Sequence, residues 1–345
     1  MGFESRLHDW DGLAVVTGRH HPTDTWMFVA LHDDALGTPT GGTRLRVYDR
    51  PEDGLLDAQR LARGMSHKWA AVDLPFGGGK AVLAASRELT GDERGDLLRS
   101  YGELLESLRG AFQTGEDLGT TPEDMAYLGR FTRHVHGTDP DGGAARDPGP
   151  YTARGVLAAI RAAFDVRFGS RDVAGRSIVV QGVGDVGAPL ARSLAAAGAD
   201  LTLADPDGAR LGALVEETGA RTVAPHLVYD VACDLFAPCA VGQVVNGSTV
   251  PRLACAIVAG SANNQCERAE DADALSARGI LMVPDFVANA GGALAFGSMN
   301  LGVTDEAEIA RRLDGLGDRV RAILVEAGSR GESPARTAVR QVEAV

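Results

Sequence analysis

Ten consecutive residues decide the fold of this sequence: Ile178-Val179-Val180-Gln181-Gly182-Val183-Gly184-Asp185-Val186-Gly187. A short apolar run, typical of a buried strand, leads into the spacing Gly-x-Gly-x-x-Gly, which opens a predicted helix over 186–197. Glycines at these positions let the backbone turn tightly and approach a pyrophosphate, whose charge the helix N-terminus favours. The stretch predicts the turn of a dinucleotide-binding βαβ unit, with five residues beside the cofactor: Gly182, Gly184, Asp185, Val186 and Gly187.

A carboxylate stands where such a unit needs one. Asp205 ends the next predicted strand, about twenty residues beyond the glycines, which is the position of the acid that binds a ribose 2′-hydroxyl. A 2′-phosphate would be repelled there, so the sequence favours NAD over NADP. The alternative interpretation is a glycine-rich turn that holds no ligand, with Asp205 as a helix cap.

Strands and helices alternate around this stretch. This alternation indicates a parallel sheet covered by helices, as in a doubly wound Rossmann domain. The predicted elements are helices at 151–164, 186–197 and 209–218 and strands or short apolar runs at 177–181, 200–205, 233–236, 255–259 and 280–283.

A second α/β region precedes residue 138. Its predicted elements are strands at 12–18, 25–32 and 80–84, a helix at 51–69, a glycine-rich loop at 76–79 and a helix start at Thr121-Pro122. The segment 138–150, dense in Gly, Pro and Asp, is typical of a domain boundary. We therefore expect an α/β fold of two domains: a substrate-binding, catalytic and oligomerisation domain at 1–146 that includes the C-terminal residues 322–345, and a Rossmann NAD-binding domain at 147–321.

Composition excludes several classes of protein. The net charge of −13 disfavours nucleic acid and anionic lipid as partners. No apolar run is long enough to span a membrane, and no secretory signal is evident, so we expect a cytoplasmic protein. The four cysteines lack metal-ligand or redox-motif spacing and are expected to be reduced thiols, and no metal site is predicted.

Two lysines and one aspartate are the candidate reaction centre. Lys68 ends the first long predicted helix, Lys80 follows three glycines, and Asp117 stands in a second glycine-flanked loop. A lysine amine in apolar surroundings near a second cation has a lowered pKa, which makes it a usable general base. The alternative is structural: Lys68 as a helix C-terminal cation, Lys80 as a surface lysine and Asp117 as a turn former.

Seven blocks of sequence, in order between about residue 12 and residue 343, resemble the glutamate/leucine/phenylalanine/valine dehydrogenases. The blocks are Gly41-Gly42-Thr43-Arg44, Gly64-Met65-Ser66-His67-Lys68, Gly77-Gly78-Gly79-Lys80, Glu116-Asp117-Leu118-Gly119-Thr120-Thr121, Phe236-Ala237-Pro238-Cys239-Ala240, Gly260-Ser261-Ala262-Asn263-Asn264-Gln265 and Pro284-Asp285-Phe286-Val287-Ala288-Asn289-Ala290-Gly291-Gly292.

This resemblance implies a reaction: reversible, NAD-dependent oxidative deamination of a hydrophobic L-amino acid to its 2-oxo acid and ammonium, by a homo-oligomer. It implies that Lys68 binds the substrate carboxylate, that Lys80 activates the attacking water and that Asp117 exchanges protons with the amino group. It further implies that the backbone N–H of Gly42 binds the carboxylate.

The resemblance also extends the cofactor site. It implies that Asn263 lies near both the carboxylate and the nicotinamide, and that Asn289 lies near the nicotinamide carboxamide. The other positions it adds beside the cofactor are Thr152, Ala237, Pro238 and Cys239.

Substrate choice is inferred from departures within the same resemblance. Thr40 stands where glutamate-specific relatives carry lysine, so glutamate is not the expected substrate. Gly115 and Phe76 favour the phenylalanine branch, since glycine leaves room for a ring. Phe296, beside Ala293 in the expected side-chain pocket, favours smaller substrates instead. A methylene or two shifts preference by only about 1–3 kcal/mol, so phenylalanine is favoured slightly over leucine or valine.

Two other classes of function stay open at this point. One is the same fold acting on a pathway-specific amino acid, an N-alkyl amino acid or an amine. The other is a non-catalytic, NAD-binding regulatory protein. Retention of Lys68 argues against an amine, and retention of Lys80 and Asp117 argues against a non-catalytic role. We expect the chemistry in a cleft between the domains, which a hinge closes to exclude water.

Overall fold

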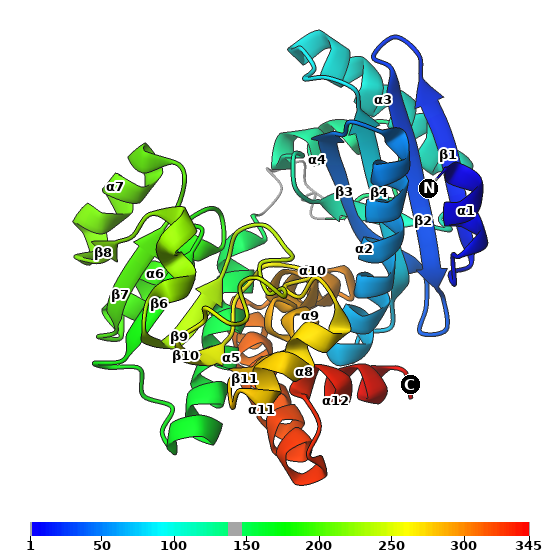
Figure 1. Ribbon diagram of the computed structural model, residues 1–345. Helices are drawn as coiled ribbons and strands as arrows, with labels where there is room; N and C mark the ends of the chain where they lie inside the picture. Colours follow the sequence, from blue (N-terminus) through cyan, green and yellow to red (C-terminus); the bar gives the residue numbers. More distant parts are fainter. Residues whose placement is uncertain (1, 137–146, 345) are drawn as a thin grey trace. The chain divides into compact units, whose positions relative to one another are not determined.

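The computed structural model describes residues 2–136 and 147–344 and divides the chain into two compact units, Met1–Asp147 and Pro148–Val345 (Figure 1). The division falls close to the predicted boundary at 146/147. Most of the boundary segment predicted at 138–150 lies outside the described residues.

The first unit is built on a mixed five-stranded sheet of order β1-β2-β4-β3-β5. Strand β2 is antiparallel to both of its neighbours, β1 and β4, whereas β3 is parallel to both β4 and β5. The elements of this unit are α1 (Phe3–His8), β1 (Ala14–His20), β2 (Thr25–Asp33), β3 (Pro39–Val47), α2 (Pro51–Ala71), β4 (Gly77–Ala85), α3 (Gly91–Ser107), β5 (Gln113–Glu116) and α4 (Pro122–Leu128).

Alternation along β2 and β4 assigns each side chain to one face of this sheet. Phe28, Val82 and Ala84 pack with α2 on one face. Val29 and Leu83 pack with α3 and α4 on the other. Lys80 is even-numbered like Val82 and Ala84, and therefore belongs to the α2 face. Both faces of β4 are covered, and all nine of its residues are buried.

The three glycines before Lys80 are the start of the central strand β4, and the prediction of a loop there was wrong. Each of them lets another part of the unit approach the sheet closely. A Cβ on Gly78 would lie 1.9 Å from Ser66 Oγ of α2, and one on Gly79 would lie 2.7 Å from the ring of Phe112. Glycine is thus required here for packing rather than for a turn.

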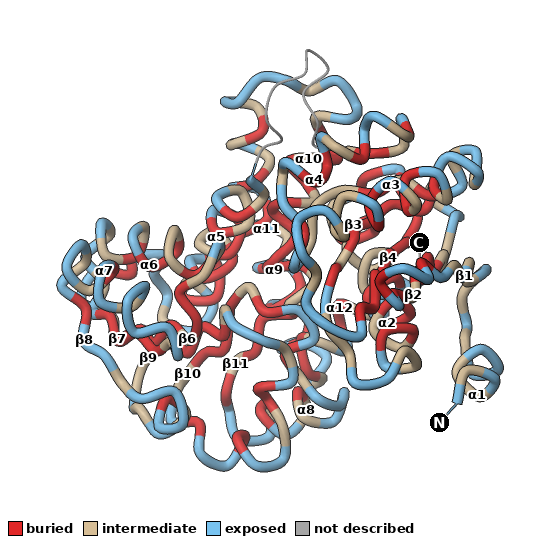
Figure 2. Tube along the Cα trace, turned by 90° about the horizontal axis from the view of Figure 1, so that it is seen from above, coloured by how far each residue is buried: buried red, intermediate tan, exposed pale blue. Residues whose placement is uncertain are grey.

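The second unit has a six-stranded parallel sheet of order β11-β10-β9-β6-β7-β8. Counted from β6, this is the 3-2-1-4-5-6 order of a Rossmann fold. Figure 2 shows its strands as largely buried, whereas α7 carries mainly exposed and half-buried residues. Its first elements are α5 (Gly149–Phe168), β6 (Ser177–Gln181), α6 (Gly187–Ala196), β7 (Asp200–Ala204), α7 (Gly208–Thr218), β8 (Arg221–Thr222) and the 3₁₀ helix η1 (Pro225–Asp230).

The remaining elements continue the sheet and then cover it. They are β9 (Cys233–Pro238), β10 (Cys255–Val258), α8 (Ala269–Ala277), β11 (Leu281–Met282), α9 (Asp285–Ala288), α10 (Gly291–Asn300), α11 (Glu306–Arg330) and α12 (Pro334–Val342). Among the described residues, no helix is both long and apolar enough to cross a membrane.

The C-terminal residues 322–345 group with the second unit, not with the first as the sequence led us to expect. The reason is packing. Helix α11 lies along α5, and α12 contacts α8 and β11. Ion pairs add to this, since Arg336 of α12 binds Asp273 of α8 and Arg321 of α11 binds Asp165 of α5.

Candidate active site and dinucleotide site

Lys80 is buried in the centre of the first sheet, with only 5% of its surface exposed. Its Nζ lies 3.1 Å from Oδ1 of Asp117. Burial lowers the pKa of the Lys80 amine; Asp117 opposes this shift and Arg44 adds to it. The alternative that Lys80 is a surface lysine is therefore wrong, and the group is suited to act as a neutral amine.

Asp117 follows β5 in a loop that backbone contacts hold against β3. Leu45 N donates to Leu118 O at 3.0 Å, and Thr120 Oγ1 donates to Thr43 O at 2.9 Å. The Asp117 N–H donates to Thr120 Oγ1 at 3.0 Å. Burial alone would raise the pKa of the Asp117 carboxyl, but Lys80 and Arg44 outweigh it and hold the pKa well below its usual range.

Gly42 of β3 lies directly beside this pair. A Cβ at Gly42 would stand 2.8 Å from Asp117 Cβ and 3.2 Å from Lys80 Nζ. Glycine at this position therefore lets Asp117 and Lys80 approach β3 closely. Gly115 is paired with Gly42 across β3 and β5, and a Cβ there would meet nothing closer than 3.7 Å. The structure thus brings four of the predicted site residues together: Lys80, Asp117, Gly42 and Gly115.

Lys68 lies in the last turn of α2 and is half-buried. Its neighbour Trp69 fastens this turn to the sheet, because its Nε1 donates to Thr40 O at 2.8 Å. The Trp69 ring also packs on Phe76, with centroids 4.9 Å apart. Thr40 itself is buried, and its hydroxyl donates to Thr38 O. Lys68 therefore belongs to the helix that covers the Lys80 face of the sheet.

A count of basic residues gives a further signal that the motif-based reasoning missed. The sequence contains 32 arginines but only two lysines, Lys68 and Lys80. A guanidinium cannot be deprotonated in a protein, whereas a lysine amine can. The positions that keep lysine are those to which the resemblance assigns substrate and water chemistry.

Arg44 and Asp57 were also missed as parts of this site. Arg44 Nε donates to Asp117 Oδ2 at 2.8 Å, and its Nη1 donates to Asp57 Oδ2 at 2.9 Å. The hydroxyl of Tyr48 donates to the same Asp57 oxygen at 2.6 Å. Arg44 is in one of the quoted sequence blocks, but nothing local indicates its partners, because the contact with Asp57 requires α2 to pack on β3.

In the second unit, the predicted glycine turn joins β6 to α6. Gly182 has φ +92, and a Cβ on Gly187 would lie 1.9 Å from Gly182 O. A Cβ on Gly184 would meet only Arg210 Nη1, at 3.6 Å. Two glycines are thus required by the turn itself, and Gly184 keeps an open side, as a pyrophosphate requires. Asp185 is exposed, and Val186 is the N-cap of α6.

The carboxylate of Asp205 is engaged with this turn. Its Oδ2 accepts the Val183 N–H at 2.8 Å, and its Oδ1 accepts the Asp207 N–H at 2.8 Å. A carboxylate has about four lone-pair positions, so each oxygen keeps one for a ribose hydroxyl. The cap suggested as the alternative role for Asp205 belongs instead to Asp207, which accepts from Ala209 N and Arg210 N at the start of α7.

The end of β9 lies beside the glycine turn, at the point where the strand order reverses. Val180 pairs with Ala237 and Gln181 with Pro238, and Cys239 N donates to Gln181 O at 2.7 Å. In open parallel sheets, ligands bind outside the carboxyl ends of the strands at this reversal.

Asn289 offers an acceptor that fits a carboxamide. Its Nδ2 donates to Asn263 Oδ1 at 3.0 Å and to Ser261 O at 3.2 Å. Its Oδ1 is buried and has no hydrogen-bond partner within the described part of the chain. A buried acceptor without a donor is costly, so this atom is suited to receive an N–H₂ group from the nicotinamide carboxamide. The residues present therefore fit the expected dinucleotide.

Thr152, Ala293 and Phe296 lie where α5 meets α10. Thr152 Oγ1 donates to Pro148 O at 2.9 Å and accepts the Gly292 N–H at 3.1 Å. Ala293 and Phe296 are half-buried on α10, and the Phe296 ring meets the edge of Tyr151, with centroids 6.0 Å apart.

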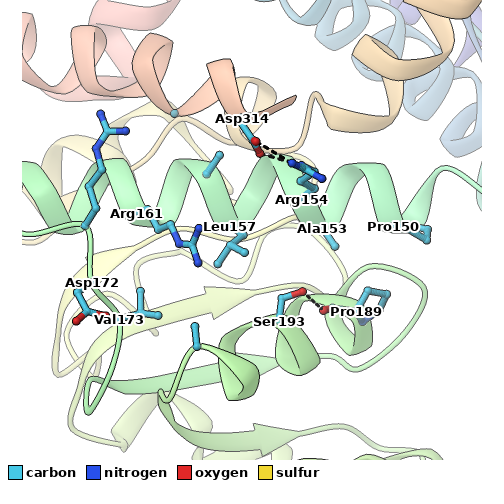
Figure 3. Close-up of a pocket in the computed structure, with 14 residues that line it drawn as sticks. Pro150, Ala153, Arg154, Leu157, Arg161, Asp172, Val173, Pro189, Ser193 and Asp314 are labelled. Carbon is cyan, nitrogen blue, oxygen red and sulfur yellow. Dashed lines mark hydrogen bonds and ion pairs between the residues drawn. The ribbon is translucent and has the colours of Figure 1, made fainter. Parts of the chain in front are cut away.

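A cavity of about 890 Å³ lies elsewhere in the second unit, among α5, α6 and α11 (Figure 3). Its lining includes none of the predicted site residues. Two of its arginines are already neutralised, because Arg154 binds Asp314 at 2.7 Å and Arg171 binds Asp318 at 3.0 Å. The candidate site is therefore defined by side-chain geometry and not by this cavity.

Comparison with known proteins gives the family. The model described as Glu/Leu/Phe/Val dehydrogenase, dimerisation domain, matches residues 20–134, and that of Glutamate/Leucine/Phenylalanine/Valine dehydrogenase matches residues 142–314. Leucine dehydrogenase of Geobacillus stearothermophilus is 42% identical over 77% of this chain and 72% of its own length. Phenylalanine dehydrogenase of Lysinibacillus sphaericus is 39% identical over 76% of this chain and 70% of its own length.

The crystal structure of L-tryptophan dehydrogenase from Nostoc punctiforme is similar throughout, with a TM-score of 0.79 at 34% identity over 99% of this chain and 97% of that one. The fold and the order of the quoted sequence blocks are consistent with these matches. The chain belongs to the glutamate/leucine/phenylalanine/valine dehydrogenase family.

Proposed function

We propose that this chain catalyses the reversible oxidative deamination of a hydrophobic L-amino acid to its 2-oxo acid and ammonium, with NAD as the preferred cofactor. The observation that carries the proposal is the buried Lys80–Asp117 pair, 3.1 Å apart, with Gly42 packed closely against it. The relatives named above are dehydrogenases of leucine, phenylalanine and tryptophan, which supports a hydrophobic side chain.

Each side chain has a proposed task. Lys68 and the Gly42 N–H hold the substrate carboxylate, which orients Cα. The bound dinucleotide supplies the acceptor for the hydride that leaves Cα. Asp117 takes and returns protons at the substrate nitrogen, and the neutral amine of Lys80 removes a proton from the water that adds to the imine carbon. Loss of ammonium then gives the 2-oxo acid.

The proposed cofactor contacts use the second unit. Backbone N–H groups of the turn from Gly182 to Gly187 hold the pyrophosphate, and Asp205 holds the ribose hydroxyls. The preference for NAD over NADP rests on the negative charge of Asp205. We further propose a homo-oligomer, which is supported by the match of residues 20–134 to a dimerisation domain.

Substrate choice is proposed from three positions. Gly115 leaves open space beside Gly42, Thr40 offers no cation for a second carboxylate, and Phe296 narrows the side-chain pocket. Gly115 favours phenylalanine, Phe296 favours smaller side chains and Thr40 disfavours glutamate, so phenylalanine is favoured only slightly over leucine or valine.

The test is absorbance at 340 nm with L-Phe, L-Leu, L-Val, L-Ile, L-Met, L-Trp and L-Glu, each with NAD and with NADP. We expect NADH from at least one hydrophobic amino acid and little from glutamate. Lys80→Ala is the control, since it should abolish turnover while NAD binding by calorimetry persists. Absence of turnover from every hydrophobic amino acid, in both directions of the reaction, would overturn the proposal.

A further inference from the structure

The two oxygens of Asp117 are contacted by two different basic side chains. Oδ1 faces Lys80 Nζ at 3.1 Å, and Oδ2 accepts from Arg44 Nε at 2.8 Å. The carboxylate is thus shared. Neither the proposed reaction nor the family resemblance assigns Arg44 a task.

Arg44 is itself held from the other side. Its Nη1 donates to Asp57 of α2 at 2.9 Å, and Tyr48 donates to the same Asp57 oxygen at 2.6 Å. The Arg44 side chain is only 13% exposed, which limits its alternatives. The planar guanidinium of Arg44 thus binds two carboxylates through two different nitrogen atoms. A lysine ammonium, which has one nitrogen on a flexible stem, cannot reproduce this arrangement.

The loop that carries Asp117 does not depend on this contact. Backbone and hydroxyl bonds from Leu45 and Thr120 fix the loop against β3. Loss of the Arg44 contact therefore frees the carboxylate of Asp117 while its backbone stays in place.

We propose that Arg44 is a positioning residue for the proposed deamination: it holds one oxygen of Asp117 and so prevents that carboxylate from closing fully onto Lys80. Asp57 and Tyr48 keep Arg44 in this pose. The role rests on the proposed function, in which Lys80 must be an uncharged amine.

The charges recorded around the Lys80 amine have the signs this role requires. They come from three elements: Asp117 from the loop after β5, Arg44 from β3 and Asp57 from α2. Burial lowers the pKa of Lys80 and Asp117 raises it, and Arg44 lowers it again. Removal of Arg44 should therefore favour the ammonium form of Lys80, both by loss of a positive charge and by a tighter contact with Asp117.

The test uses the fact that Lys68 and Lys80 are the only lysines in the sequence. Trace labelling with acetic anhydride across a pH series, read by mass spectrometry, follows the uncharged amine of each without any need for turnover. In Arg44→Gln we expect the labelling midpoint of Lys80 to move up by about one pH unit, so that labelling below the midpoint is about tenfold slower. Labelling of Lys68 should stay within about twofold, as an internal reference.

A merely structural role for Arg44 would also raise the midpoint, because a loosened core rehydrates Lys80, but it would speed labelling above the midpoint, where the amine is uncharged. The proposal predicts a raised midpoint with this limiting rate within about twofold of the wild-type value. Arg19→Gln is the control, because it breaks an Arg–Asp pair with Asp24 in the same unit that involves neither Lys80 nor the loop carrying Asp117. In this control, both the midpoint and the limiting rate of Lys80 labelling should stay as in the wild-type chain. An unchanged or lowered midpoint in Arg44→Gln would overturn the proposal.

A double-variant cycle separates positioning from direct charge. Arg44→Gln placed on Asp117→Asn should shift the Lys80 midpoint less than it does on the wild-type chain, because the contact through Asp117 is gone. An equal shift in both backgrounds would contradict positioning. If Arg44→Gln fails to fold, Arg44→Lys takes its place, because it keeps the positive charge but loses the planar guanidinium. A smaller upward shift of the Lys80 labelling midpoint is then expected, and no shift would overturn the proposal.

Turnover gives the last readout. In Arg44→Gln, kcat should fall about tenfold or more, whereas KM for the amino acid changes less than about threefold. If the wild-type chain turns over no amino acid, the proposed function fails, yet the labelling series still decides whether Arg44 governs Lys80.

Discussion

The candidate site of the first unit and that of the second unit satisfy their polar groups in different ways. Around Lys80, ionisable side chains from three elements are largely buried and are paired with one another. In the glycine turn, the structure instead leaves space beside Gly184 and a buried acceptor on Asn289 without a partner. The first arrangement sets the charge of a few groups, whereas the second shapes a surface for a ligand. Substitutions around Lys80 should therefore act on proton transfer, whereas substitutions in the glycine turn should act on the space available to a ligand.

The largest effect is expected from Lys80→Arg, which tests the role of charge in the site around Lys80. Arginine keeps a buried cation beside Asp117 but cannot supply a neutral amine. Turnover should fall by a factor of about 10²–10⁴, the typical contribution of general base catalysis. Steady-state kinetics measures this, with NAD binding by calorimetry as the control. Near-normal turnover would mean that Lys80 is not the general base and that its charge does not govern this site.

The glycine turn offers a matched pair of steric tests. Gly187→Ala places a Cβ 1.9 Å from Gly182 O, so it should lower the free energy of unfolding by about 1–3 kcal/mol and weaken NAD binding up to about a hundredfold. Gly184→Ala meets only the flexible Arg210 Nη1 at 3.6 Å, so stability should hold while NAD affinity falls. Chemical denaturation and calorimetry separate the two. Unweakened NAD binding in Gly184→Ala would mean that its open side does not face the cofactor.

Asp205→Ala tests whether one carboxylate serves both the turn and the ribose. Loss of its bonds to Val183 N and Asp207 N should cost about 1–2 kcal/mol of unfolding free energy. The preference for NAD over NADP, as a ratio of kcat/KM values, should fall about 30-fold. Asp207→Ala is the control, because it removes the cap of α7 and should leave cofactor preference unaltered. An unchanged preference in Asp205→Ala would assign Asp205 to the turn alone.

The smallest effect is expected at Gly115, which lies in the same unit as Lys80 but whose proposed role is steric. Gly115→Ala adds a Cβ with no neighbour closer than 3.7 Å, so stability should change by less than about 0.5 kcal/mol. The ratio of kcat/KM for phenylalanine over leucine should fall about tenfold, since a methyl group in a side-chain pocket shifts discrimination by about 1–3 kcal/mol. An unchanged ratio would place the substrate side chain away from Gly115.

The same contrast explains how much the sequence could predict. The glycine turn and its flanking elements are specified by residues that are close together in the sequence. Ten residues predict the strand, the turn and the helix, and β6 spans 177–181 as predicted. The site around Lys80 instead depends on contacts between residues that are distant in sequence. Arg44 and Asp117 meet only because β3 and β5 are adjacent, and both strands were missed as elements. The glycines before Lys80 resemble a loop in composition, yet they form a central strand, because close packing by Ser66 and Phe112 demands them.

The scarcity of lysine has a practical consequence. Supports and cross-linkers that couple through lysine side chains find no such group elsewhere in these 345 residues, so Lys68 and Lys80 are the only lysine targets. Lys80 is buried and Lys68 half-buried, so attachment would be slow and would disable the centre wherever it succeeded. A surface arginine replaced by lysine, such as Arg221 in its exposed pair with Asp200, would supply a harmless anchor that leaves both native amines untouched.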